Sequence, residues 1–135
     1  VRVKPLVKRV VELGMPAVGL TEQSNMCSLV RFYKTTTGAG VKPIIGADLW
    51  LENPDEPENP FRLTLLARDN KGYLNLPEIV SLGYTEGQRY GKPIVQRKWL
   101  ESRADGLIAM SGAKMGDVCK ALLADKLLLQ TTCTF

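Results

Sequence analysis

The amino-acid sequence predicts an α/β fold built on a mostly parallel sheet. Short apolar runs of strand length alternate with segments whose apolar residues recur at helical spacing. The composition is that of a globular protein, with 44% hydrophobic and 24% charged residues. Strands that alternate with helices favour a largely parallel sheet with helices packed on its faces.

The first half of the chain holds two predicted helix–strand pairs. They are a helix over residues 4–13, a strand over 15–20, a helix over 26–35 and a strand over 41–51. Pro5 suits a first helical turn and Gly14 a helix end, whereas the apolar run after Pro16 is typical of a buried strand. The polar residues that follow this strand include Ser24 and Asn25, and either is a suitable N-cap for the second helix.

The second half adds further strands and helices. In order they are a loop over residues 53–60, a strand over 61–68, a helix over 73–83, a loop over 84–93, a helix over 96–102, a strand over 106–110 and a helix over 116–124. Asp69 begins a turn or caps the helix that follows it. Pro77 fits the first turns of that helix better than its middle, because proline lacks the N–H that a helix interior needs.

Charge and cysteine content narrow the possible partners. The formal net charge of +4 is compatible with a nucleic-acid partner and equally with none, and no five like charges are consecutive. No apolar stretch approaches the roughly 20 residues that cross a bilayer, so we expect no membrane partner. Cys27, Cys119 and Cys133 form no C-x-x-C pair, and we expect them to be reduced in the cytoplasm.

The sequence contains no histidine at all. Histidine is the commonest metal ligand and the usual general base near neutral pH. A Ser-His-Asp or Cys-His site therefore cannot be built within this chain, and neither can a histidine-rich zinc centre. Any hydrolytic chemistry here would have to rely on carboxylates.

A few polar side chains follow the predicted strands, where α/β folds place their chemistry. Glu22 and Gln23 follow the first strand, and Asp48 lies near the end of the second. Two carboxylates that converge at one sheet edge suit Mg²⁺ or Mn²⁺, which prefer oxygen ligands. The alternative is that Glu22 caps a helix or forms a salt bridge and that Asp48 is an ordinary strand-edge acid.

Several blocks of the sequence resemble the first part of bacterial DNA polymerase III alpha subunits. The blocks are residues 13–22 (LGMPAVGLTE), 25–33 (NMCSLVRFY), 38–48 (GAGVKPIIGAD), 65–67 with 72–76, and 106–112 with 115–118. Each block is weak alone, but together they keep the family's order and spacing. The chain is identified as a member of this family, within its N-terminal PHP domain and of the gammaproteobacterial type.

The resemblance implies a particular fold and its limits. The family's PHP domain is a distorted (β/α)7-type barrel, and residues 1–125 resemble part of it. We expect the N- and C-terminal parts of the domain to be missing, since the chain starts without Met and the family's first motif would precede Val1. Residues 126–135 form a tail that matches the family poorly. A barrel that lacks strands at both ends would leave unpaired edges, so we expect the isolated chain to be poorly soluble or oligomeric.

The resemblance also implies that a metal site has been lost. Glu22 and Gln23 stand where metal-binding members carry Asp and His. Asp48 replaces a Glu, Arg62 replaces a common His, and Ala113 replaces a Cys. These are interpreted as vestigial metal-site positions, with no catalytic residue and no metal ligand left in this chain.

The function implied is therefore that of a non-catalytic PHP scaffold that docks the proofreading exonuclease subunit. The whole family protein is a DNA-directed DNA polymerase that also binds DNA and other replicase subunits and uses Mg²⁺, whereas this segment needs no cofactor of its own. One alternative is a residual metal-dependent phosphoesterase or 3′–5′ exonuclease that uses Glu22 and Asp48. A small basic nucleic-acid-binding domain ranks last, because the basic residues are scattered along the sequence.

Overall fold

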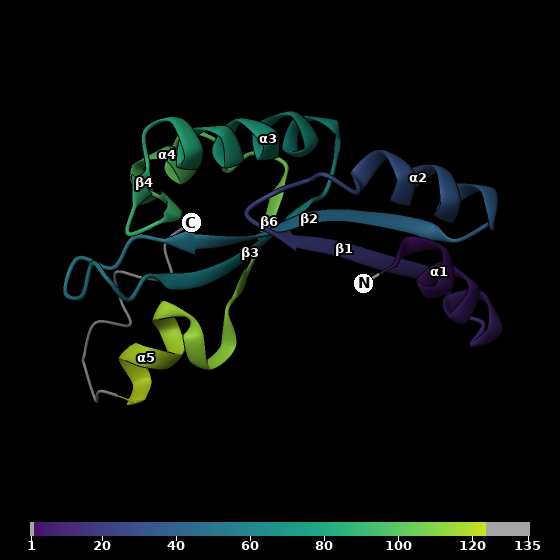
Figure 1. Ribbon diagram of the computed structural model, residues 1–135, viewed down its shortest axis with the longest axis horizontal. Helices are drawn as coiled ribbons and strands as arrows, with labels where there is room; N and C mark the ends of the chain where they lie inside the picture. The colour runs from purple at the N-terminus through teal and green to yellow at the C-terminus, as the bar shows by residue number, and fades with distance from the viewer. Residues whose placement is uncertain (1, 124–135) are drawn as a thin grey trace.

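The computed structural model describes residues 2–123 as a sheet flanked by helices (Figure 1). The elements are, in order, α1 (Val3–Glu12), β1 (Ala17–Gln23), α2 (Leu29–Gly38), β2 (Lys42–Leu51), β3 (Phe61–Ala67), α3 (Asn70–Thr85), β4 (Gln88–Arg89), β5 (Lys92–Val95), α4 (Arg97–Glu101), β6 (Leu107–Ser111), the 3-10 helix η1 (Ala113–Met115) and α5 (Asp117–Leu123). The α/β class is confirmed. The predicted tail, residues 126–135, lies outside the described residues.

The sheet is mixed, so the prediction of a mostly parallel sheet is wrong. β2 pairs in parallel with β1 and with β5, but β3 pairs antiparallel with both β2 and β6, and β4 pairs antiparallel with β5. The physical reason is the connections. A loop of nine residues returns the chain from β2 directly into β3 without a crossover helix, and such short returns give antiparallel neighbours.

β2 is the central strand, and two strands share one of its edges. Residues 42–48 of β2 pair with β1, and Trp50 and Leu51 pair with β5 further along the same strand. The opposite edge is occupied by β3 along residues 46–51. β1 and β5 therefore lie one after the other along β2, and polar side chains at the end of β1 come next to the middle of β2.

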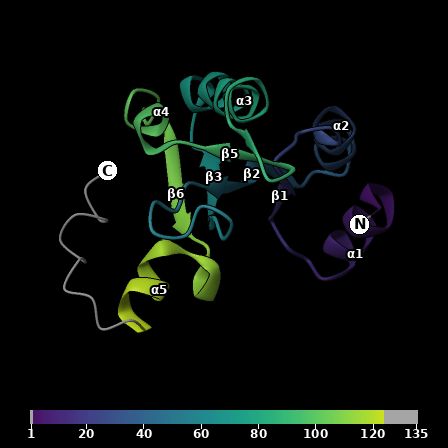
Figure 2. The same ribbon diagram turned by 60° about the vertical axis from the view of Figure 1, so that its left-hand side comes forward.

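The main core lies between one face of the sheet and the helices α3 and α4 (Figure 2). Alternate residues of β2 and β3 point into it, as strand geometry requires. Its buried members are Ala47, Leu49, Leu51, Leu63, Leu65, Leu76, Ile79, Val95, Trp99 and Leu100. A second cluster joins α1 and α2 through Val3, Val7 and Phe32, and Val18 and Leu20 of β1 pack against it. Each fully buried Leu or Phe contributes about 1.5–3 kcal/mol, so this face anchors the sheet.

The start of α3 is fixed by a cap and a close backbone contact. The Asp69 carboxylate accepts a hydrogen bond from the Gly72 N–H at 3.0 Å, which confirms Asp69 as the N-cap. Because Asp69 caps here, α3 begins at Asn70, earlier than predicted, and Pro77 lies in the middle of the helix rather than near its start. A Cβ on Gly72 would overlap the Gly106 carbonyl, so the helix packs directly on the backbone before β6.

The predicted loop over residues 84–93 contains a hairpin instead. α3 continues to Thr85, and β4 and β5 then pair across a two-residue turn at Tyr90 and Gly91. Both turn residues have positive φ, 51° and 70°, as in the tight turns that suit twisted hairpins. No helix among the described residues is long and apolar enough to cross a membrane.

Candidate functional site

The predicted site positions lie where β1, β2 and β3 run side by side. The strand register places Gln23 opposite Asp48, and Asp48 opposite Thr64. Arg62 lies one pleat further along β3, opposite Trp50. Since paired residues share a face and successive residues along a strand point to opposite faces, Gln23, Asp48, Thr64, Arg62 and Trp50 lie on the sheet face opposite the main core.

Asp48 is the centre of this group, and its carboxylate is fully engaged. Its side chain is 11% exposed and forms an ion pair with the Arg62 guanidinium, which is 38% exposed. The other carboxylate oxygen accepts a hydrogen bond from the Thr64 hydroxyl at 3.3 Å. A carboxylate removed from water in this way needs such partners, and here β3 supplies both.

Glu22 does not join Asp48. The register pairs Glu22 with Ala47, which belongs to the main core, so its side chain lies on the opposite face of the sheet from Asp48. Its carboxylate accepts a hydrogen bond from the Ser28 backbone N–H at 2.8 Å, at the start of α2. Glu22 therefore caps a helix, as the alternative interpretation expected. The predicted caps Ser24 and Asn25 lie before the helix, because α2 begins only at Leu29.

Gln23 and the residue before Ala113 form hydrogen bonds to backbone carbonyls of the site. The Gln23 side-chain amide donates to the Asp48 carbonyl at 3.0 Å, and the Ser24 N–H donates to the same oxygen at 2.7 Å. Ala113 begins η1 just after Gly112, whose N–H donates to the Arg62 carbonyl at 3.2 Å. The structure thus brings Gln23, Asp48 and Arg62 together. Ala113 directly follows Gly112, the residue that bonds to the Arg62 backbone.

Two neighbours of Asp48, Thr64 and Trp50, were not predicted from the sequence. Thr64 donates to its carboxylate, and the Trp50 ring carries two cations, with Arg62 at 5.8 Å and Lys92 at 4.9 Å from the ring centroid. Because residues i and i+2 of a strand share a face, the sequence could have indicated that Trp50 lies on the face of Asp48 and that Thr64 lies on the face of Arg62. The register that joins the two strands was not available from the sequence.

The side chains present do not suit a metal ion. Within residues 2–123, no three His, Cys, Asp or Glu side chains lie together in a group that could hold one. The Asp48 carboxylate is paired with a guanidinium, which is always charged and has no lone pair to give to a metal. A further carboxylate, Glu22, points to the other face of the sheet. The donor set therefore fits an ion pair better than a metal centre.

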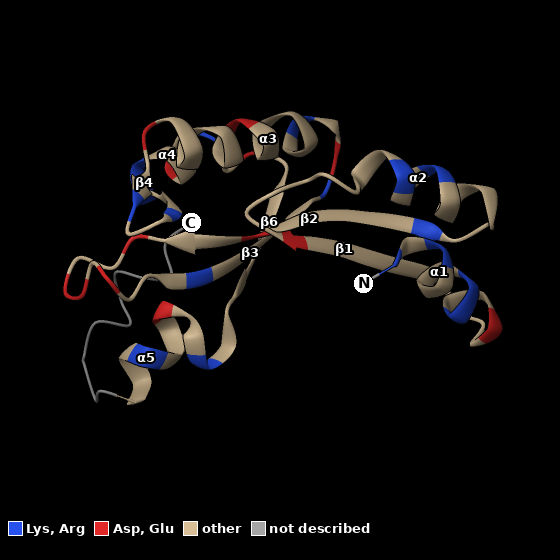
Figure 3. Ribbon diagram, in the orientation of Figure 1, with Lys and Arg blue, Asp and Glu red and all other residues tan. Residues whose placement is uncertain are grey.

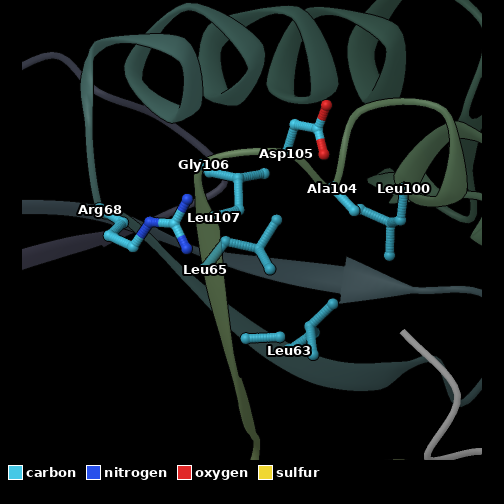
Figure 4. A pocket seen from close by; sticks show the side chains of 9 residues that line it. Leu63, Leu65, Arg68, Leu100, Ala104, Asp105, Gly106 and Leu107 are labelled. Carbon is cyan, nitrogen blue, oxygen red and sulfur yellow. The ribbon is translucent and has the colours of Figure 1, made fainter.

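A separate cavity of about 310 Å³ lies on the core side of the sheet (Figure 4). Its lining is Leu63, Leu65, Arg68, Leu100, Ala104, Asp105, Gly106, Leu107 and Ala109. Arg68 and Asp105 are its charged members, and a hydrogen bond from Lys71 holds the pKa of Asp105 below its ordinary value. Leu63 and Leu65 alternate with Arg62 and Thr64 on β3, so this cavity and the Asp48 group lie on opposite faces.

Comparisons with known proteins identify relatives of this chain. The chain is 58% identical over 123 residues to the DNA polymerase III subunit alpha of Pseudomonas aeruginosa, covering 91% of this chain and 10% of that one. It is 43% identical over 129 residues to the subunit of Escherichia coli K12, covering 96% and 11%. The chain thus spans about a tenth of the length of these curated relatives.

A solved structure gives a weaker likeness. A crystal structure from Bifidobacterium adolescentis, of a protein assigned as a metal-dependent phosphoesterase, has a TM-score of 0.46 and 11% identity over 58% of this chain and 26% of that one. The family model described as "PHP domain" matches residues 1–133, which is nearly the entire sequence. On that match, the chain belongs to the PHP domain family.

Proposed function

We propose that this chain is the PHP segment of a DNA polymerase III alpha subunit and serves there as a non-catalytic scaffold. The support for the parent protein is the identity of 42–58% to alpha subunits over about nine tenths of the chain. We further propose that the complete protein synthesises DNA in the cytoplasm with Mg²⁺ held by residues outside this chain. In it, the mixed sheet would be one part of a distorted (β/α)7 barrel.

The observation that carries the scaffold role is the Asp48–Arg62 ion pair. A metal-dependent phosphoesterase needs ligand atoms with free lone pairs that face a common cation. Here the most buried carboxylate of the candidate site is neutralised by a fixed positive charge, and Lys92 adds another within 4.9 Å of the Trp50 ring. Two cations beside the site would repel a divalent metal, so the pair contributes packing and not chemistry.

The alternative function is a residual metal-dependent phosphoesterase or 3′–5′ exonuclease. It requires Glu22 and Asp48 to bind one metal together. Their placement on opposite faces of the sheet, with Glu22 bonded to the start of α2, opposes that arrangement. We therefore interpret Glu22 and Asp48, like Gln23, Arg62 and Ala113, as vestigial positions of a metal site.

Metal content and nuclease activity test the scaffold role. The purified chain is dialysed against Mn²⁺, analysed for bound metal and assayed on a single-stranded oligonucleotide, with Asp48→Ala as the matched variant. We expect less than stoichiometric metal and no cleavage above that of the variant. Stoichiometric metal together with cleavage that Asp48→Ala abolishes would overturn the scaffold role and establish the phosphoesterase.

Docking of the proofreading exonuclease subunit is the second part of the proposal. Sedimentation of the chain with that subunit should give a one-to-one complex if this segment supplies the docking surface. A complex formed by the complete alpha subunit but not by one from which residues 1–123 have been deleted would agree with it. Equal binding by both forms would place the docking surface elsewhere.

A further inference from the structure

The net positive charge of this protein is concentrated at one end. Residues 1–47 contain seven of the 18 basic residues but only two of the 14 acidic ones, a net charge of +5. The remaining residues have a net charge of −1. These seven basic residues lie on or directly before α1, on α2 and at the first residue of β2 (Figure 3). The acidic loop between β2 and β3 lies at the opposite end of the molecule.

These seven cations are available to a partner. All of them are exposed: Arg2, Lys4, Lys8, Arg9, Arg31, Lys34 and Lys42. Arg9 pairs with Glu12 at 3.1 Å, and the other six form no ion pair within residues 2–123. Positive charge that the fold does not use internally produces an attractive potential for polyanions.

A groove of about 470 Å³ lies beside this basic end. Its walls are α2, the start of β2 and the beginning of α3, and its lining is Leu29, Val30, Tyr33, Lys34, Pro43, Ile45, Ala67, Arg68, Asp69, Asn70 and Tyr73. We call it the Tyr33–Tyr73 groove. The two tyrosines are 54% and 41% exposed, although helix periodicity alone would have allowed Tyr33 to face the core.

The groove combines flat aromatic and apolar surfaces with cations. Lys34 and Arg68 line it, and the exposed Lys42 directly precedes its member Pro43. Asp69 is its single acid, and that carboxylate is already bonded to the Gly72 N–H and to Arg68, which hold its pKa below the ordinary value. The charge presented to a ligand is therefore positive.

We propose that the Tyr33–Tyr73 groove binds single-stranded nucleic acid, with bases stacked on the tyrosines and phosphates on the surrounding cations. Single-strand binding sites combine a positive surface along the backbone with aromatic side chains that stack on bases without regard to sequence. A duplex hides its base faces, so it can use only the cations. This role is independent of metal binding at the vestigial positions, because the groove lies on the helix side of the sheet, away from Asp48.

Binding of the intact chain to a fluorescent oligothymidylate of about 16 nucleotides, measured by anisotropy, tests the proposal. We expect Tyr33→Ala and Tyr73→Ala each to weaken binding roughly tenfold, the usual effect of losing one stacked base. Lys34→Ala should reduce the slope of log K against log salt by about 0.7, the effect of one lost phosphate contact on a single strand.

Matched variants away from the groove are the controls. Tyr84→Ala removes a tyrosine that is 46% exposed near the end of α3, and Lys98→Ala removes an exposed lysine on α4. Both should bind like the original chain. The proposal fails if the controls lose as much affinity as the groove variants, if a duplex of equal length binds as tightly, or if polyglutamate competes as well as the oligonucleotide.

Photo-crosslinking locates the contact without relying on any variant. An oligonucleotide that carries 5-iododeoxyuridine is irradiated with the intact chain, and the crosslinked peptides are identified by mass spectrometry. Crosslinks at Tyr33 or Tyr73 would support the proposal. Crosslinks that appear only at other aromatic residues, such as Tyr90 on the hairpin turn, would overturn it.

Discussion

At the scale of single residues, the sequence predicts which residues belong to the candidate site but not which of them contact one another. The sequence indicated Asp48 and Arg62 as positions of one former site, and the structure brings them into contact. It equally indicated Glu22, which the register turns to the other face. A shift of one residue in a strand exchanges its faces, and the sequence of one strand does not say which residues of a neighbouring strand lie opposite it. The site was therefore predictable as a set of positions but not as a geometry.

The Asp48–Arg62 pair can be tested by removing only its charge. Arg62→Met keeps an apolar stem over Trp50 but leaves the nearly buried Asp48 carboxylate without its cation. We expect the free energy of unfolding in urea to fall by about 1–2 kcal/mol, less than for a fully buried pair because the guanidinium is 38% exposed.

Two further variants bracket this result. Adding Asp48→Asn to Arg62→Met should recover most of the lost stability, since no unpaired charge then remains. Arg9→Met breaks the exposed Arg9–Glu12 pair and should cost below about 0.5 kcal/mol. If Arg9→Met and Arg62→Met proved equally costly, the Asp48–Arg62 pair would have no special structural role.

At the scale of elements, helices and buried strands followed from the sequence, and their ends and turns did not. β2 and β3 match the predicted strands to within a residue or so, because their apolar alternation is strong. The β4–β5 hairpin was missed because Tyr90 occupies a left-handed turn position where Asn or Asp would have given the usual signal. The start of α3 was predicted too late because Pro77 was expected near the first turn. Tertiary packing holds α3 together around this proline.

The contact between α3 and the backbone before β6 predicts a large effect from one methyl group. Gly72→Ala would place its Cβ against the Gly106 carbonyl, so α3 must move away from the sheet. We expect unfolding to become easier by about 1–3 kcal/mol in urea denaturation, as for other overpacked sites.

Gly38→Ala is the control for this change. Gly38 is the last residue of α2, and a Cβ there would meet nothing within 4 Å. The substitution should leave stability unchanged or raise it by up to about 1 kcal/mol, because alanine restricts the unfolded chain. Equal losses at both glycines would argue against a direct contact at Gly72.

At the scale of the whole molecule, the sheet ends in open edges. Within the described residues β6 pairs only with β3, and its outer side carries unpaired backbone groups. Ile108 and Met110 on this strand are 46% and 44% exposed. An edge with exposed apolar side chains is a template for pairing with another strand, so the expected self-association of the isolated chain has a specific location.

Met110→Lys should weaken that self-association, because a lysine on an edge strand opposes pairing with a second copy. We expect the dissociation constant from sedimentation equilibrium to rise roughly tenfold, in line with the burial energy of one methionine. Leu74→Lys, on an exposed position of α3, should have no effect. A chain that stays monomeric at all concentrations and melts in one sharp transition would refute this location.

The shared edge of β2 sets an order of events during synthesis of the protein. β1 can align with the first part of β2 as soon as both leave the ribosome, but Trp50 and Leu51 must wait for β5. About 40 residues separate Leu51 from Lys92, which takes roughly 2–8 s at ordinary bacterial elongation rates. For those seconds the exposed end of β2 is a place where a chaperone, or a wrong strand, can bind first.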